Sequence, residues 1–182
     1  MTTDNRTPRE KVLEFYKGFN QDEFISSGPA SLEESNISEQ RLHLKMNLIA
    51  EEFFELVEAV YGKYSAEVME EAWAQAQHGD DKNRDIVEAA DALSDLVYVI
   101  EGFNIEAGIP SDEIFDEVHA SNMSKLDNDG NPIVSDGVTP AIHDGKIKPL
   151  GKILKSENYF DPDLKAIIEG KTPDRTPKVK KN

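Results

Sequence analysis

The sequence of 182 residues contains no cysteine and only one tryptophan. Without cysteine the chain can form neither disulfides nor thiolate zinc sites, so oxygen or imidazole ligands must hold any metal. No apolar stretch approaches the length of a membrane span, and the first residues lack the continuous apolar core of a signal peptide. These absences predict a cytoplasmic protein that has no membrane partner.

Basic residues are also scarce, because 20 lysines and arginines face 36 aspartates and glutamates, which gives a formal net charge of −16. Such a charge disfavours nonspecific binding to nucleic acid or to anionic membranes. It attracts cations instead, and hard cations such as Mg2+ suit the available oxygen ligands best.

Apolar residues recur at helical spacing through most of the chain, and no strong series of strands interrupts them. Helices are expected over residues 8–20, 39–61, 65–77, 84–107, 111–125 and 164–168. The pattern predicts an all-α protein, a helical bundle with a mostly irregular C-terminal segment that includes a loop or short hairpin over 133–150. We expect one domain over residues 1–170, with a motif core at 37–125, and a disordered basic tail at 171–182.

The helix expected over residues 84–107 is apolar on nearly all sides, which is typical of a buried helix. It nevertheless carries Glu88, Asp91 and Asp95 along one stripe. Buried carboxylates are costly unless paired charges or a metal ion compensate them. This cost is the first indication of function.

Two pairs of carboxylates share the same helical spacing, Glu52-x-x-Glu55 and Glu88-x-x-Asp91. Residues three apart are neighbours on one face, so each pair can hold one cation. If the two helices pack antiparallel, four oxygen ligands converge, and Mg2+ would keep coordination positions for water and a polyphosphate. A solvated acidic face gives the same spacing, so the spacing by itself leaves both interpretations open.

The run LIAEEFFELVEAV, followed by EAADALSDLVYVI, resembles the MazG-like branch of the all-α nucleoside triphosphate pyrophosphohydrolases. These proteins are relatives of phosphoribosyl-ATP pyrophosphohydrolase and of the dimeric dUTPases, and they share the patterns E-E-x-x-E and E-x-x-D. The pieces VHASNMSKLDNDG, DGKIKP and YFDPDL are also similar to a subgroup of this family. The resemblance therefore covers roughly residues 37–170.

The resemblance implies Mg2+-dependent hydrolysis of a nucleoside triphosphate to the monophosphate and pyrophosphate, with Mn2+ as a substitute ion. A deoxynucleotide or a non-standard nucleotide is the expected substrate. The family's metal-ligand positions fall on Glu52, Glu55, Glu88 and Asp91. Glu51 takes the position that activates the attacking water in some relatives. Asp95 could be an extra ligand, an outer-shell acceptor or a group that orients a lysine.

Asn122 and Lys125 match the family's S-N-M-x-K motif and are candidates for binding substrate. Lysine can bind a phosphate as a point charge, and asparagine can both donate to and accept from a base or sugar edge. Lys146 and Tyr159 are further candidates. Because helices apolar on more than one face exceed what a thin bundle can bury, we expect a homodimer or a dimer of dimers.

Other classes of helical protein fit less well. A di-iron carboxylate bundle needs Glu-x-x-His on two helices, and none of the four histidines has a glutamate three residues before it. The spacing of Asp91 and Asp95 differs from the acidic cluster of prenyl-transfer enzymes. A non-enzymatic acidic interaction protein is the alternative. The sequence leaves open the nucleotide, the phosphorus attacked, the number of metal ions and the role of residues 62–82.

Overall fold

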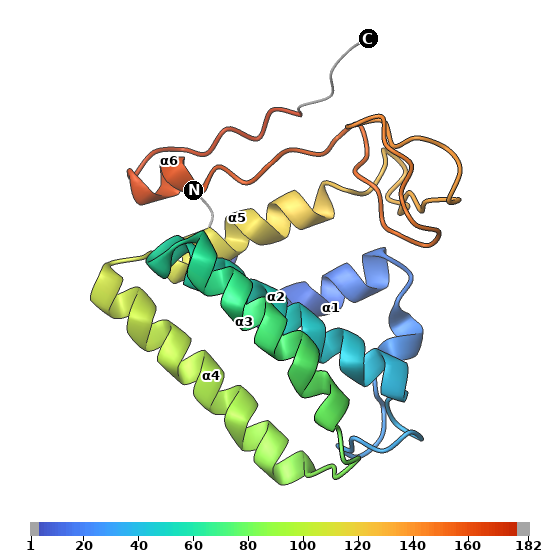
Figure 1. Cartoon of the computed structure of the whole chain (residues 1–182). Helices are drawn as coiled ribbons and strands as arrows, with labels where there is room; N and C mark the ends of the chain where they lie inside the picture. Colours follow the sequence, from blue (N-terminus) through green and yellow to red (C-terminus); the bar gives the residue numbers. More distant parts are fainter. Residues whose placement is uncertain (1–3, 178–182) are drawn as a thin grey trace. The chain divides into compact units, whose positions relative to one another are not determined.

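The computed structural model describes residues 4–177, which are almost entirely helices and irregular segments (Figure 1). The elements of this range are α1 (Pro8–Gly18), η1 (Asp22–Phe24), α2 (Glu39–Tyr61), α3 (Lys63–Ala76), η2 (Gln77–Gly79), α4 (Ile86–Ala107), α5 (Ser111–Met123) and α6 (Leu164–Ile168). The β-pairing found in residues 4–177 consists of isolated bridges, all between residues 126 and 153. The predicted all-α class and the irregular C-terminal segment are confirmed.

Local sequence signals set the residues at which α1 and α2 begin. Thr7 and Glu10 form a capping box before α1, with Pro8 at the first helical position. Ser38 accepts a hydrogen bond from the backbone N–H of Arg41 and thereby caps α2. These signals explain why both helices begin at the residues that the sequence predicts.

Chain contacts divide the protein into two compact units. Unit 1 combines residues 1–25 with 96–182, and unit 2 comprises residues 26–95. The residues 86–95 of α4 belong to unit 2, whereas residues 96–107 of the same helix belong to unit 1.

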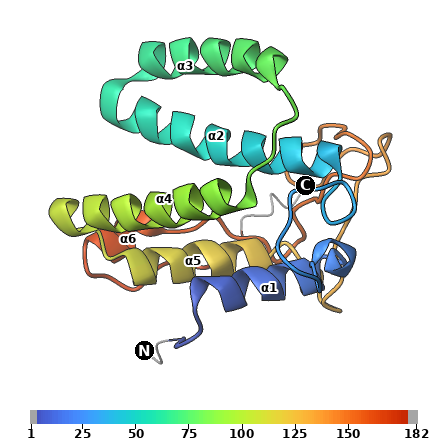
Figure 2. The same ribbon diagram turned by 90° about the horizontal axis from the view of Figure 1, so that it is seen from below.

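In unit 2, α2 and α3 lie side by side as an antiparallel hairpin (Figures 1 and 2). Gly62 joins them with a φ of +92°, a conformation that favours glycine. Phe54 and Ala66 are buried, one from each helix. The Trp73 indole is half-buried and donates a hydrogen bond of 2.9 Å to Asn47 Oδ1.

In unit 1, α5 packs against both α1 and α6 (Figure 2). Lys11 of α1 is only 3% exposed and forms an ion pair with Asp116 of α5. One helical turn along each helix, Glu14 Oε2 lies 2.9 Å from His119 Nε2. Charged pairs thus help to hold α1 to α5.

The C-terminal segment is tied to α5 by the fully buried carboxylate of Glu117. This carboxylate lies 2.9 Å from Arg175 Nε and 2.8 Å from Arg175 Nη2, and it also accepts a bond from the backbone N–H of Asp163. A buried carboxylate requires such compensation. We predicted a disordered tail over residues 171–182. The structure describes residues 171–177, which include the contact of Arg175 with Glu117, and residues 178–182 lie outside the described range.

No residue of α4 is buried, although its composition predicts a buried helix. Val87 is 71% exposed, Tyr98 81% and Ile105 79%. Burial of these side chains requires an apolar surface that covers the helix. Among residues 4–177, no helix has the length and apolar character that crossing a membrane requires.

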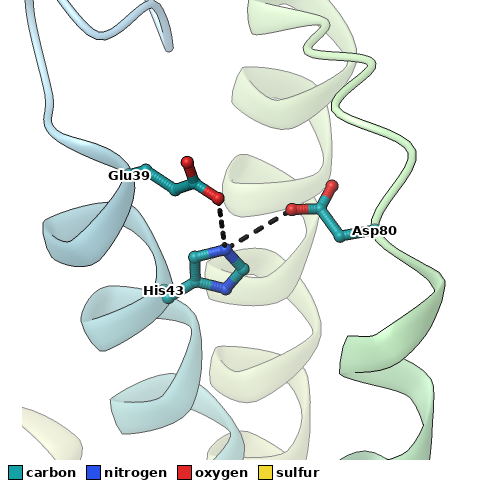
Figure 3. Close-up of side chains that lie close together, drawn as sticks. All are labelled: Glu39, His43 and Asp80. Atoms are coloured by element: carbon teal, nitrogen blue, oxygen red, sulfur yellow. Dashed lines mark ion pairs between the residues drawn. The ribbon is translucent and has the colours of Figure 1, made fainter.

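An ion-pair network fastens the segment before α4 to the first turns of α2 (Figure 3). His43 Nε2 lies 3.7 Å from Glu39 Oε1 and 3.4 Å from Asp80 Oδ2. Arg84 donates to both Asp80 oxygens, at 2.7 and 2.8 Å, and Lys82 pairs with Glu39. The Arg84 hydrogen bonds, with one from the backbone N–H of Lys82, hold the pKa of the Asp80 carboxyl well below its usual range.

We predict that Asp80→Asn lowers the Tm at pH 7 and that the loss shrinks in acid. The pKa of Asp80 is depressed in the folded state, so its contribution to stability is complete above its unfolded value of about 3.8 and disappears as the pH falls below it. Thermal unfolding followed by circular dichroism from pH 7 to below this value tests the prediction. Asp81→Asn is the control, and a Tm difference for Asp80→Asn that grows in acid contradicts the prediction.

Candidate active site

The first acidic motif lies on α2, where Glu51, Glu52 and Glu55 are all exposed. Glu52 and Glu55 are three residues apart and therefore share one face of the helix. Glu51 projects about 40° from Glu55, so its carboxylate can serve the same space. One helix thus presents two candidate ligands and a candidate base together.

The second acidic motif lies near the start of α4, where Glu88, Asp91 and Asp95 are exposed. Asp85 fixes this start, because its Oδ1 accepts hydrogen bonds from the backbone N–H groups of Val87 at 2.9 Å and Glu88 at 3.1 Å. Capping by an aspartate of this kind explains why the helix begins just before Glu88.

The six motif carboxylates form no side-chain hydrogen bond or ion pair with any other residue that the structure describes. Lys63, Lys82 and Arg84 of unit 2 pair with other acids instead. In residues 4–177, one group of potential metal ligands has its ligand atoms within 4.8 Å of one another, and this group contains none of the motif carboxylates. Convergence of four ligands on one ion therefore stays a prediction, while their charge is available to a cation.

A hollow of about 800 Å3 opens beside the first turns of α2. Its lining consists of Glu34, Ser38, Glu39, Gln40, His43, Leu44 and Asn47. Asn47, the last of these lining residues along the chain, lies one helical turn before Glu51. Its volume is within the range of about 300–1,000 Å3 that small-molecule pockets occupy.

Sequence reasoning missed the cluster of Glu39, His43 and Asp80 in unit 2. The spacing of Glu39 and His43 places them on one helix face, but only tertiary structure brings Asp80 to them (Figure 3). Their ligand atoms lie within 4.8 Å of one another, close enough for one divalent ion. The cations of Lys82 and Arg84 already compensate both carboxylates.

The candidate substrate residues belong to unit 1. Lys125 Nζ donates a hydrogen bond of 2.7 Å to Asn122 Oδ1, and Tyr159 is buried. Lys155, which sequence reasoning missed, places its Nζ 4.0 Å from the centre of the Tyr159 ring. Partial burial and the charge of Lys155 lower the pKa of Lys125. Lys146 is exposed, and its side chain contacts none of these residues in the described structure.

Comparison with known proteins places the two acidic motifs inside a recognised family. The sequence model described as Phosphoribosyl-ATP pyrophosphohydrolase matches residues 24–122, a range that contains α2, α3 and α4. No match is found among curated proteins.

The fold also resembles a crystal structure from Exiguobacterium sp. 255-15, described as an inferred NTP pyrophosphohydrolase. The TM-score is 0.59 at 20% sequence identity, over 91% of this chain and 95% of the other. At this identity the likeness establishes the all-α fold alone, whereas the family match spans more than half of the chain. The family and the Glu39–His43–Asp80 cluster indicate that a divalent metal is used. The chain thus belongs to the phosphoribosyl-ATP pyrophosphohydrolase family of MazG-like proteins, and it is a hydrolase that acts on phosphoric anhydrides.

Proposed function

We propose that this protein uses Mg2+ to hydrolyse a nucleoside triphosphate, a deoxynucleotide or a non-standard nucleotide, to the monophosphate and pyrophosphate. The observation that carries the proposal is that the E-E-x-x-E and E-x-x-D carboxylates lie inside the matched region without cationic partners among the described residues. The cytoplasm stays the compartment predicted from the sequence.

The donor set fits Mg2+ better than it fits other metals. Glu52, Glu55, Glu88 and Asp91 offer only carboxylate oxygens, which are the ligands of hard cations. The Glu39–His43–Asp80 cluster includes an imidazole and is already neutralised by Lys82 and Arg84, so it is a poorer site for Mg2+. We therefore place the catalytic metal at the motif carboxylates.

In this mechanism Glu51 accepts a proton from the attacking water, because an exposed carboxylate beside the ligand face can act as a general base. The metal ion, when bound, would neutralise charge on the phosphate oxygens. Asp95, one turn beyond Asp91, is assigned an outer-shell role in holding the ligands in position. Asn122 and Lys125 bind the nucleotide, with Lys146 and Tyr159 as further contacts.

We predict that Glu52→Gln and Asp91→Asn each lower the rate of pyrophosphate release at least about tenfold to a hundredfold, as losses around metal sites typically do. Each change replaces one ligand oxygen and removes its charge. The rate should be measured with Mg2+ over a panel of standard, deoxy and damaged nucleotides. Glu58→Gln is the matched control, because Glu58 is an exposed glutamate of α2 outside the motif.

Unchanged pyrophosphate release in both ligand variants would contradict the assignment of the metal site. If the purified protein releases no pyrophosphate from any nucleotide of the panel, the proposed reaction itself is wrong.

For Glu51 we predict that Glu51→Gln lowers kcat by about 10²- to 10⁴-fold, the usual contribution of a general base. The affinity for Mg2+ should stay unchanged, because Glu51 is not a ligand in this mechanism. Steady-state kinetics and calorimetric titration with Mg2+ separate the two effects. Weaker Mg2+ binding with an unchanged kcat would instead make Glu51 a ligand.

We further propose that a second copy of the chain covers α4, so that the working protein is a homodimer or a dimer of dimers. Val97 is 61% exposed and Tyr98 81%, on a helix that is apolar nearly all round. Exposed apolar area of this extent on consecutive turns is typical of a subunit interface. A second copy is the occupant that fits best, because the net charge of −16 disfavours a membrane or a nucleic acid.

Sedimentation should show an oligomer at micromolar concentration. Val97→Glu is expected to raise the dissociation constant at least about tenfold, because it would bury an unpaired charge in the interface. Val138→Glu is the matched control, since Val138 is 71% exposed but lies in the irregular C-terminal segment. A monomeric wild-type protein would contradict this proposal.

A further inference from the structure

Lys125 is a half-buried cation that has no carboxylate partner. Its Nζ donates a hydrogen bond of 2.7 Å to Asn122 Oδ1, and none of the described acidic residues forms an ion pair with it. The chain carries 36 acidic residues, so acids are abundant. A partly desolvated ammonium without a carboxylate partner is therefore unusual in this protein.

Lys155 is held in place by an aromatic ring and a carboxylate. Its Nζ lies 4.0 Å from the centre of the Tyr159 ring and 3.6 Å from Asp161 Oδ1. The ring is itself fixed, because Tyr159 is 7% exposed, its hydroxyl donates to Asp161 Oδ1 at 2.8 Å, and the His143 ring packs edge-on against it at 5.5 Å. These contacts position the Lys155 ammonium before any ligand binds.

The two lysines lie on segments that are hydrogen-bonded to each other. Ser156 Oγ donates to the Ser124 carbonyl at 2.9 Å, and the Phe160 N–H donates to Ser124 Oγ at 3.2 Å. The charge of Lys155, after partial burial, lowers the pKa of Lys125. Like charges held near each other disfavour their charged forms, and an anion that contacts both ammonium groups relieves this repulsion. Asn122 accepts from Lys125 through Oδ1, which leaves its Nδ2 group as a hydrogen-bond donor.

We propose that Lys125 and Lys155 together bind one phosphoryl group of a polyphosphate, with Asn122 Nδ2 as a third donor. A phosphoryl group fits because it carries up to two negative charges and three oxygens, which match two ammonium groups and an amide. This site rests on the proposed function for its natural ligand, either the phosphate chain of the nucleotide or the released pyrophosphate. Lys155 is a residue that the family motif does not assign.

The experiment is calorimetric titration of the full-length protein with inorganic pyrophosphate and, separately, with a non-hydrolysable nucleoside triphosphate analogue. EDTA is present in both titrations, so that metal-dependent binding does not contribute. Lys125→Met and Lys155→Gln should each weaken binding at least about tenfold, because each removes a charge-assisted hydrogen bond. Lys155→Arg keeps the charge and should retain binding.

Lys152→Gln is the matched control, because it removes one exposed lysine from the same segment as Lys155. Lys155 has a side chain that is 45% exposed, so Lys155→Gln tests the site even if Lys125→Met fails to fold. Weaker binding of both ligands assigns the site to the nucleotide's phosphate chain, and weaker binding of pyrophosphate only assigns it to the product.

Absence of binding in the wild-type protein, or equal affinity in the wild type and the lysine variants, overturns the lysine site. These results are independent of catalysis, because no metal and no hydrolysis are involved. The proposed function can therefore fail while the lysine site stands, and the lysine site can fail while pyrophosphate release is observed.

Discussion

A chain with 36 acidic and 20 basic side chains has too few cations to neutralise every carboxylate, so the position of each cation decides which charges stay free. Lys11 and Arg175 compensate Asp116 and Glu117 in unit 1, and Arg84 compensates Asp80 in unit 2. Charged side chains of both signs lack an oppositely charged partner among the described residues. The E-E-x-x-E and E-x-x-D carboxylates have no partner among the described residues, and none of the described acidic residues forms an ion pair with Lys125. Free negative charge suits a metal ion, and free positive charge suits the phosphates of a substrate.

Apolar surface is the second constraint. Among the residues that the structure describes, the buried apolar side chains are four aromatic residues and four alanines, whereas large apolar residues along α4 stay exposed. Charged pairs also hold unit 1 together, as do hydrogen bonds from buried hydroxyl groups such as the bond from Ser121 to the Phe160 carbonyl. Burial of apolar area is the main favourable term in folding, and this is the physical reason for proposing that a second copy covers α4.

Much of the fold could be predicted because helix signals are local. Pro8, the capping residue Ser38 and the turn at Gly62 predicted helix boundaries to within a few residues. The surface that covers α4 could not be predicted in the same way. Hydrophobic periodicity indicates that a helix face must be covered, but it does not indicate which surface covers it. For the candidate site, the spacing of Glu52 and Glu55 identified ligands that share a face. It gave no information on the contact between His43 and Asp80 or on the hydrogen bond between Ser156 and Ser124, which join segments that are distant in sequence.

The sequence by itself determined the all-α class, the two acidic motifs and the family, because helical period and motif spacing are properties of neighbouring residues. Tertiary structure alone decided where the scarce cations lie. It placed Arg84 and Lys82 on Asp80 and Glu39, and it joined the segment that carries Lys155 to the turn that carries Lys125 through the hydrogen bond from Ser156 to Ser124. The reason is physical: electrostatic compensation depends on distance in space, and only the folded chain sets the distances between side chains that are far apart in sequence.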